Sequence, residues 1–396
     1  MTKTNFRYSE LIGFVLRRKI SKAKVTSIKG RCCEKDSVPY NSPFFFKAYD
    51  LFMAQGTSLS YFTDKMTALG ASPKHIHRVY RAWLGLGSWE AKSDCRYPAA
   101  LEKEIPAIRR ELEGLSRVLP VQSAQAETVK LIVGLADGEC VESVLLPRRA
   151  LCISTQVGCA VGCRFCMTGR GGLTRQLGSA EIVAQVVQAR KIRPDLKKVV
   201  FMGMGEPSHN LREVMEAVKF LGCTLGLAHK EIVVSTVGDK RLFDALRQSD
   251  VRPAIALSLH TTDNAKRRKL LTNAPKLTAE EVLEMTLSYA EETKYPAQIE
   301  WTLIRGVNDS EAEVARLAEL LKGRYAMVNF IAVNPVEGTG FERPERSHME
   351  DLITILRKNG TVATIRDSAA QDIEGGCGQL RSRIISMKEA VCSADR

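Results

Sequence analysis

Two patterns of apolar positions alternate along the chain from residue 150 onward. Short apolar runs typical of buried strands are followed by longer segments whose apolar residues recur at helical spacing. The predicted strands are 150–155, 198–202, 231–236, 253–259, 298–303, 327–333 and 361–366, and the predicted helices are 179–193, 211–225, 240–249, 278–293, 310–322 and 345–358. Two helices begin with a capping box, Thr278 with Glu281 and Ser310 with Glu313. This order predicts an α/β fold of parallel βα units with right-handed crossovers.

Upstream of residue 150 the pattern differs. Segments 128–135 and 140–146 alternate between apolar and polar residues around the turn Asp137-Gly138, which predicts a β-hairpin. Glu142 lies on the second strand, where the pattern alone indicates an ordinary exposed glutamate. Apolar residues at helical spacing before residue 114 predict a small helical domain. The predicted divisions are a basic arm 1–40, a helical accessory domain 41–127, a β-hairpin 128–149, a core 150–385 and a tail 386–396.

The composition is that of a globular protein with excess positive charge. Of 396 residues, 44% are hydrophobic and 26% are charged, and no apolar run reaches the length of a membrane span. The net charge of +13 favours a polyanionic partner such as RNA. The arm 1–40 contains ten basic and three acidic residues. Two interpretations remain open for it: a solvated tail, or an arm that binds along the phosphates of a nucleic acid.

Three cysteines, Cys159, Cys163 and Cys166, form a C-x3-C-x2-C motif. Gly158 and Gly162 let the backbone wrap tightly, which suits a loop around a metal–sulfur cluster. Three thiolates leave one iron of a 4Fe–4S cube open, and an open iron can bind S-adenosylmethionine. The motif, with an aromatic residue before its third cysteine, resembles the radical SAM signature.

Other interpretations of the cysteines are weaker. A structural zinc site normally has four ligands, and no nearby cysteine or histidine completes the set. The eleven cysteines follow no even framework and the sequence shows no signal peptide, which argues against structural disulfides and indicates a reducing cytoplasm.

Polar residues follow the predicted strands, where ligands collect in parallel βα folds. The second strand ends at Gly205 and Glu206, and Glu206 is suited to an ammonium group of the cofactor. The residues at the ends of the later strands are suited to hydrogen bonds with a ribose, a carboxylate or an adenine edge; they are Ser235, Ser258, Leu259, His260 and Asn334.

Near the carboxyl end, Cys377 lies in the run Gly-Gly-Cys-Gly, and Cys152 lies on the first core strand. With these residues the chain resembles the RlmN/Cfr family of radical SAM RNA adenine methyltransferases. The motifs that carry the resemblance are ALCISTQVGCA from Ala150, FMGMGEP from Phe201, VVST from Val233, ALSLH from Ala256, VNFIAVNP from Val328 and GCGQL from Gly376.

The resemblance implies a partial (βα)6 barrel that follows a small helical domain. It also implies a radical mechanism, which allows methylation of an electron-poor ring carbon of adenine. One S-adenosylmethionine would methylate Cys377, and a second, cleaved to a 5'-deoxyadenosyl radical, would take a hydrogen atom from that methyl group. The carbon would then add to the adenine, and Cys152 would remove the ring proton and release the product by forming a disulfide with Cys377. Glu142 matches a family proton acceptor, and the resemblance assigns the strand-end residues to S-adenosylmethionine.

Members of the family act on an adenosine of 23S rRNA, and some also act on an adenosine of tRNA, so the resemblance implies an RNA substrate. It also implies an electron donor such as flavodoxin or ferredoxin, and we expect a monomer. Carbon 2 is the usual target and carbon 8 the alternative. The basic run 266–269 is either a phosphate contact or a solvated helix start. Two other classes remain open: a radical SAM enzyme on a non-RNA substrate, and a zinc-bearing RNA-binding protein without catalysis.

Overall fold

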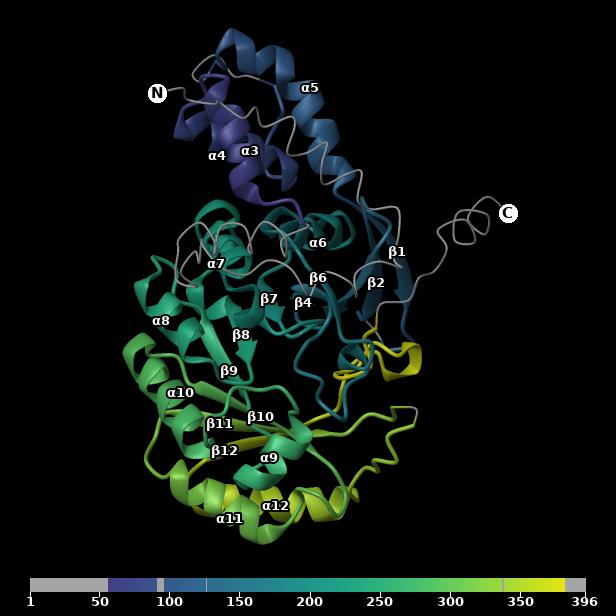
Figure 1. Cartoon of the computed structure of the whole chain (residues 1–396), viewed down its shortest axis with the longest axis vertical. Helices are drawn as coiled ribbons and strands as arrows, with labels where there is room; N and C mark the ends of the chain where they lie inside the picture. Colours follow the sequence, from purple (N-terminus) through teal and green to yellow (C-terminus); the bar gives the residue numbers. More distant parts are fainter. Residues whose placement is uncertain (1–55, 91–95, 126, 337, 382–396) are drawn as a thin grey trace, which may run out of the picture. The chain divides into compact units, whose positions relative to one another are not determined.

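The computed structural model describes residues 56–90, 96–125, 127–336 and 338–381 (Figure 1). The predicted arm 1–40 and tail 386–396 lie outside the described residues. In this part of the chain no helix is long and apolar enough to cross a membrane.

One sheet of ten strands organises the described chain, in the order β1-β2-β3-β4-β7-β8-β9-β10-β11-β12. The run from β4 to β12 is parallel throughout, and the first strands are antiparallel. The parallel strands are β4 (Ala150–Cys152), β7 (Lys198–Phe201), β8 (Ile232–Thr236), β9 (Ala254–Ser258), β10 (Ala297–Leu303), β11 (Ala326–Ala332) and β12 (Val362–Arg366). The predicted βα repeat is confirmed.

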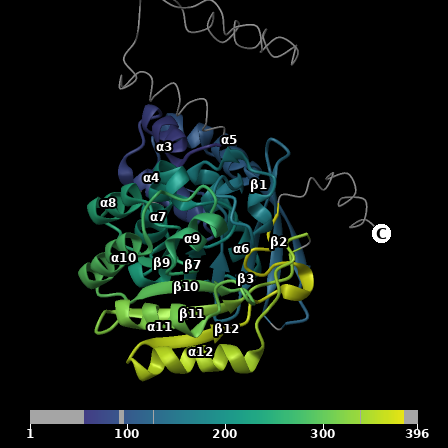
Figure 2. The same cartoon turned by 60° about the horizontal axis from the view of Figure 1, so that its bottom comes forward.

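The helices between these strands also follow the prediction, with ends shifted by a few residues. They are α6 (Ser179–Ile192), α7 (Leu211–Phe220), α8 (Lys240–Gln248), α10 (Ala279–Thr293), α11 (Glu311–Leu320) and α12 (Arg346–Lys358). The predicted helix 211–225 is α7 continued by one π-helical turn, η4 (Leu221–Leu225). One apolar core lies among the earlier strands and α6 to α8, and another between β9–β12 and α10–α12 (Figure 2).

One capping box is complete and the other is not. Thr278 and Glu281 cap each other's backbone as predicted. Ser310 caps α11 by accepting from the Glu313 N–H, but the Glu313 carboxylate does not reach back. It accepts a hydrogen bond from Thr261 Oγ1 at 2.6 Å and pairs with Lys266. A tertiary partner has replaced the local one.

The hairpin forms as predicted, from β2 (Val129–Leu135) and β3 (Cys140–Leu146), but it is not half exposed. Both strands are buried along nearly their whole length. Helix α6 packs on the hairpin, and the carboxyl-terminal segment also contacts it, since a Cβ on Gly375 would lie 3.5 Å from the Lys130 side chain. The sequence patterns did not predict β1 (Ser116–Gln122), which pairs with β2.

The predicted helical domain contains α3 (Leu59–Ala68), α4 (Pro73–Trp83) and α5 (Ala99–Gly114). It packs on the core through aromatic side chains: the rings of Tyr80 and Trp83 lie 5.1 Å and 6.2 Å from that of Phe220 at the end of α7. Tyr80 also donates from its hydroxyl to the Leu59 carbonyl at 2.8 Å, which joins α4 to α3.

Candidate active site

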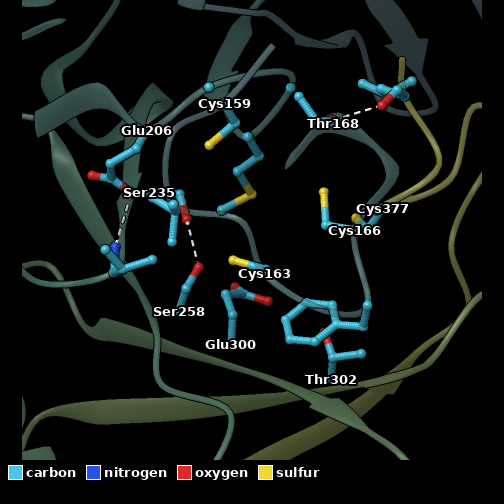
Figure 3. Close-up of a pocket in the computed structure, with 18 of the residues that line it drawn as sticks. Cys159, Cys163, Cys166, Thr168, Glu206, Ser235, Ser258, Glu300, Thr302 and Cys377 are labelled. Atoms are coloured by element: carbon cyan, nitrogen blue, oxygen red, sulfur yellow. Dashed lines mark hydrogen bonds between the residues drawn. The ribbon is translucent and has the colours of Figure 1, made fainter. Parts of the chain in front are cut away.

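The three motif cysteines lie on the loop between β5 (Gln156–Gly158) and η2 (Met167–Gly169). Two of its glycines, Gly158 and Gly162, have φ of 81° and 66°, a region that favours glycine. A Cβ on Gly158 would also lie 2.1 Å from the Gly172 carbonyl oxygen. The loop therefore needs these glycines, and it brings three thiols to one cavity, those of Cys159, Cys163 and Cys166 (Figure 3).

A segment after β9 holds this cluster loop, and the sequence patterns did not predict it. Helix α9 (Asn264–Leu270) and the three residues that follow it bond to the loop backbone. The hydrogen bonds are Arg164 N to Leu270 O (2.9 Å), Asn273 N to Val161 O (2.9 Å), Asn273 Nδ2 to Ala160 O (2.8 Å) and Thr272 Oγ1 to Gly162 O (3.1 Å). The position of the thiols is thus fixed by residues about a hundred positions away in the sequence.

The cavity extends from the cluster loop to the carboxyl ends of β7 to β10, and it encloses about 940 Å³ including its mouth. Its size falls in the range of pockets for small ligands and cofactors. Of the predicted site residues, those that line it are Gly205, Glu206, Ser235, Ser258, His260 and Cys377, together with the three motif cysteines.

Glu206 is buried beside the cysteines, and three donors hold its carboxylate. Ser208 N, Thr236 Oγ1 and Val237 N donate to it at 3.1, 2.6 and 3.0 Å. A carboxylate has about four acceptor sites, so it retains capacity for one more donor from the cavity. Gly205, at φ 102°, lets the backbone pass close to Gln156 here.

A polar row begins at the cavity, which Ser258 and Glu300 line, and continues across the sheet. Ser258, Glu300, Asn329 and Thr364 are in register on β9 to β12. Asn329 Nδ2 donates to Glu300 Oε1 at 2.7 Å, and Thr364 Oγ1 donates to Asn329 Oδ1 at 3.0 Å. Burial raises the pKa of the Glu300 carboxyl. The sequence patterns did not predict a role for Glu300; the available signal was a carboxylate between two apolar residues, Ile299 and Trp301, in the middle of a predicted strand.

His260 follows β9 and contributes a neutral ring. Its Nδ1 accepts from Thr302 N at 3.0 Å, and its ring lies edge-on to Phe165, 4.8 Å between centroids. Burial, helped by the positive charge of Arg267, lowers the pKa of His260 to about 3. The imidazole is therefore uncharged at neutral pH and offers hydrogen bonding rather than charge.

Cys377 faces the same cavity from a loop bonded to the cluster loop. Met167 N donates to the Gly378 carbonyl at 2.7 Å, and Thr168 Oγ1 donates to the Leu380 carbonyl at 2.6 Å. The Cys377 side chain is exposed, but to the cavity rather than to open solvent (Figure 3). Desolvation by the surrounding protein, and then the negative charge of Glu300, raise the pKa of its thiol to about 11.

The remaining predicted residues do not line the cavity. They are Cys152, Glu142, Leu259 and Asn334. Cys152 is a free, buried thiol on β4; burial raises its pKa, and so does the charge of Cys377, so the two sulfurs lie within electrostatic range. Asn334 is buried and donates from Nδ2 to the Cys377 carbonyl at 2.8 Å, which makes it a support of the Cys377 loop.

Glu142 is buried, which corrects its interpretation as an exposed strand glutamate. Its Oε1 pairs with Lys130 Nζ at 3.3 Å, and its Oε2 accepts from Arg381 N at 3.0 Å. The contact with Arg381 ties the hairpin to the end of the Cys377 loop. Leu259 is also buried, and its N–H donates to the Glu300 carbonyl at 3.1 Å.

The basic run 266–269 is not one surface. Lys266 pairs with Glu313, and Arg267 is buried and donates to the Val237 carbonyl. Only Arg268 and Lys269 are exposed without a charge partner among the described residues. The four residues therefore do not act as one unit, and neither a phosphate contact nor a solvated helix start describes the whole run.

Comparison with known proteins gives one family. Residues 153–318 match the model of the radical SAM superfamily. A crystal structure of a radical SAM methyltransferase from Sphaerobacter thermophilus is similar with a TM-score of 0.71 and 32% identity, over 83% of this chain and 99% of that one. The chain belongs to the radical SAM methyltransferases.

Two curated relatives are also similar over most of their length. A probable RNA methyltransferase of Azoarcus sp. strain BH72 is 52% identical over 82% of this chain and 94% of its own. Another, of Aromatoleum aromaticum, is 51% identical over 83% of this chain and 93% of its own. The predicted α/β radical SAM fold is confirmed by these matches and by the sheet.

As a radical SAM methyltransferase the protein uses a 4Fe–4S cluster and S-adenosylmethionine, and the site fits both. Among the described residues, no three His, Cys, Asp or Glu side chains are spaced to hold one metal ion. Each cysteine of a cluster binds a different iron, so three thiols that line one cavity fit a cluster that keeps one iron open. Beside them, Glu206, Ser235 and Ser258 present hydrogen-bond acceptors and donors to the cavity.

Proposed function

We propose that the protein methylates a ring carbon of an adenosine in RNA, with carbon 2 as the favoured position, through an S-methylated Cys377. The proposal includes membership of the RlmN/Cfr family, 23S rRNA and tRNA as substrates, and flavodoxin or ferredoxin as electron donor. RNA as the substrate class is supported by the relatives named probable RNA methyltransferases.

The observation that carries the proposal is the position of Cys377. Three cysteines suffice for a cluster with an open iron, and Cys377 is a fourth thiol that lines their cavity from a separate loop. Gly376 and Gly378 allow this approach: a Cβ on Gly376 would lie 2.7 Å from Asn334 Nδ2, and one on Gly378 3.1 Å from the Phe165 carbonyl. A thiol held in this way is suited to carry a one-carbon unit between cofactor and substrate.

Residues that line the cavity have separate roles in the proposed reaction. Cys159, Cys163 and Cys166 would hold the cluster, while Glu206 would take the ammonium of the methionine moiety and Ser235 and Ser258 its other polar groups. When bound, the cluster supplies the electron that cleaves S-adenosylmethionine, and S-adenosylmethionine supplies the methyl group. Cys377 would lose its proton and accept the methyl group on its sulfur. After one hydrogen atom of that group has passed to the 5'-deoxyadenosyl radical, its carbon would bond to the adenine ring.

Cys152 completes the cycle in this proposal. Cys152 would remove the ring proton, and its thiolate would then attack the Cys377 sulfur. The electron pair of the broken bond would pass to the transferred carbon, which takes up a proton to become the methyl group, and the Cys152–Cys377 disulfide that forms would be reopened by an external reductant. Both thiols are free in the structure, and Cys152 is buried next to the Cys377 loop. Glu142, whose carboxylate joins the hairpin to the end of that loop, would keep the family's proton-acceptor role.

Basic residues at the edge of the cluster loop support an RNA substrate. Arg164 is exposed on this loop and Arg170 is exposed directly after η2, and both line a second depression that shares Cys163 with the main cavity. Guanidinium groups there would contact phosphates next to a base that enters the cavity, because an enzyme acting on a ring carbon needs an unstacked base.

The test is an anaerobic reaction. The iron-reconstituted protein is incubated with S-adenosylmethionine, a reductant and RNA from a strain without the gene, and the digested RNA and the Cys377 peptide are analysed by mass spectrometry. 2-Methyladenosine together with a methyl group on Cys377 is the expected result, whereas 8-methyladenosine would move the target to carbon 8. Cleavage of S-adenosylmethionine without methyladenosine in any RNA class would overturn the RNA methyltransferase proposal.

A further inference from the structure

Arg267 on α9 is a buried cation without a carboxylate partner. Its exposed fraction is 3%, and none of the ion pairs among the described residues includes it. One of its terminal nitrogens donates to the Val237 carbonyl, but its Nε is buried with no hydrogen-bond partner. A buried charge is costly unless an opposite charge compensates it, so Arg267 needs a counter-charge.

The negative groups whose charge reaches Arg267 belong to the cluster site. They are the sulfur of Cys163, which is negative when it binds the cluster, and, after it, the Glu206 carboxylate; both favour the protonated guanidinium. Burial lowers the pKa of Arg267 to about 10 in spite of these two charges, so the side chain stays positively charged at neutral pH. Glu206 is already held by uncharged donors on both oxygens.

The fold holds Arg267 against the cluster loop. The Leu271 N–H donates to the Arg267 carbonyl at 2.8 Å, and Leu271 itself bridges to Cys163. Leu270 and Leu271 pack with Val161, Phe165 and Val237, with the motif cysteines at the edge of the same apolar cluster. Arg268, the next residue, is exposed. One arginine of the basic run thus faces the cluster loop and its neighbour faces solvent.

We propose that Arg267 is the internal counter-charge of the iron–sulfur cluster and raises the reduction potential of that cluster. Reduction adds one negative charge to the cluster, and a fixed cation in a medium of low dielectric constant stabilises that state. In this role Arg267 touches neither S-adenosylmethionine nor RNA and is a positioning residue. The inference rests on the cluster and not on the choice of RNA substrate.

The test compares charge-removing and charge-keeping variants. Arg267→Gln keeps a donor for the Val237 carbonyl but removes the charge, Arg267→Lys keeps the charge, and Arg268→Gln is the matched control on the exposed face. Each protein is reconstituted anaerobically, its iron and sulfide are counted, and the cluster is titrated against potential with detection by electron paramagnetic resonance, without S-adenosylmethionine.

Arg267→Gln should lower the potential, so that the ratio of reduced to oxidised cluster at a fixed potential falls about tenfold, equivalent to about 59 mV for one electron. Arg267→Lys should stay close to the original protein, and Arg268→Gln should not differ from it. An Arg267→Gln protein with a full cluster and an unchanged potential would overturn the proposal. So would an equal shift in the Lys variant.

The test can also be interpreted if the Arg267→Gln protein folds but holds no cluster. Folding is checked by circular dichroism. If the Lys variant retains its cluster, a need for positive charge is supported. If the Lys variant also loses it, Arg267 acts through shape alone and the proposal fails. None of these readouts involves RNA, so a failure of the RNA methyltransferase proposal would leave them unchanged.

Discussion

The side-chain amide of Asn334 donates to the backbone carbonyl of Cys377 at 2.8 Å. The same Nδ2 lies 2.9 Å from Ser368 Oγ, and Arg343 donates to Oδ1 at 2.8 Å. Asn334 therefore holds the loop that presents the thiol, although its family resemblance assigned it to S-adenosylmethionine. The two roles make different predictions for a variant.

Asn334→Asp keeps the acceptor for Arg343 and removes the donor to Cys377. A buried hydrogen bond lost in this way costs about 1–3 kcal/mol, so methylation of Cys377 should fall about tenfold to a hundredfold, with cluster content unchanged. The measurement is the rate of methyl incorporation into the Cys377 peptide by mass spectrometry. Asn359→Asp, which removes a similar bond at the exposed end of α12, is the control. Weakened S-adenosylmethionine binding with normal Cys377 methylation would instead support direct contact with the cofactor.

The cysteines should separate into two groups by function. Cys163→Ala should lose the cluster absorbance and all cleavage of S-adenosylmethionine, since the thiol is one of three in the cavity. Cys377→Ala should keep the cluster and still cleave S-adenosylmethionine, but should transfer no methyl group to RNA. Cys223→Ala, an exposed free thiol on η4, is the matched control and should retain full activity. Loss of the cluster in Cys377→Ala would make Cys377 a ligand and contradict its proposed role.

The sequence predicted the parts of the fold that depend on short-range pattern. Buried parallel strands such as β8 and β11 read as apolar runs because both faces are covered, and the helices between them carry their own caps. The cluster loop was predictable for the same reason, since its glycines and cysteines lie within ten residues. These local sequence patterns do not depend on the tertiary contacts that form around them.

The parts that depend on tertiary partners were not predictable in the same way. Glu313 has the spacing of a capping box but bonds to Thr261, because a side chain from a distant loop competes with the local N–H. Glu142 is buried because the Cys377 loop crosses the hairpin. A usable signal did exist for Arg267: Leu270 and Leu271 lie three and four positions later, so one arginine of the run shares a helix face with apolar residues.

Gly205→Ala should destabilise the fold at the entrance to the candidate cofactor site. Gly205 has φ of 102°, and a Cβ there would lie 2.7 Å from the Gln156 side chain and from Thr155 Oγ1. Backbone strain of this kind costs about 1–3 kcal/mol, so the melting temperature should fall by several degrees. Gly114→Ala, where a Cβ would meet nothing within 4 Å, should leave it unchanged or raise it. An equal melting temperature for Gly205→Ala and the original protein would contradict the strain argument.

Glu300 predicts a pH dependence of stability. Burial raises the pKa of its carboxyl above the ordinary value of 4.5, against the lowering effects of Arg366 and the Asn329 hydrogen bond. The folded state therefore favours the neutral acid, whose contribution to stability is complete below pH 4.5 and is lost as the pH rises through the raised value. Glu300→Gln removes this loss, so its melting temperature relative to the original protein should increase from pH 5 towards pH 8.

The measurement for Glu300 is thermal unfolding across that pH range without S-adenosylmethionine. Glu319→Gln, at an exposed position of α11, serves as the control and should show no trend. A constant difference between Glu300→Gln and the original protein at every pH would show that the carboxyl is charged throughout, held by its partners in spite of burial.

Arg164 and Arg170 should contribute to RNA binding through phosphates and not through bases. Each exposed guanidinium at the edge of the cluster loop would release counterions on binding, so Arg164→Ala should weaken binding of every RNA sequence to a similar degree. The slope of log affinity against log salt concentration should fall by about 0.7 for a single-stranded target. Lys322→Ala, exposed near the amino end of β11 and thus at the opposite edge of the sheet from the cavity, should change neither quantity. If Arg164→Ala instead lost affinity for one RNA sequence only, with the salt slope unchanged, Arg164 would contact a base. The cluster loop itself would then contribute to sequence recognition.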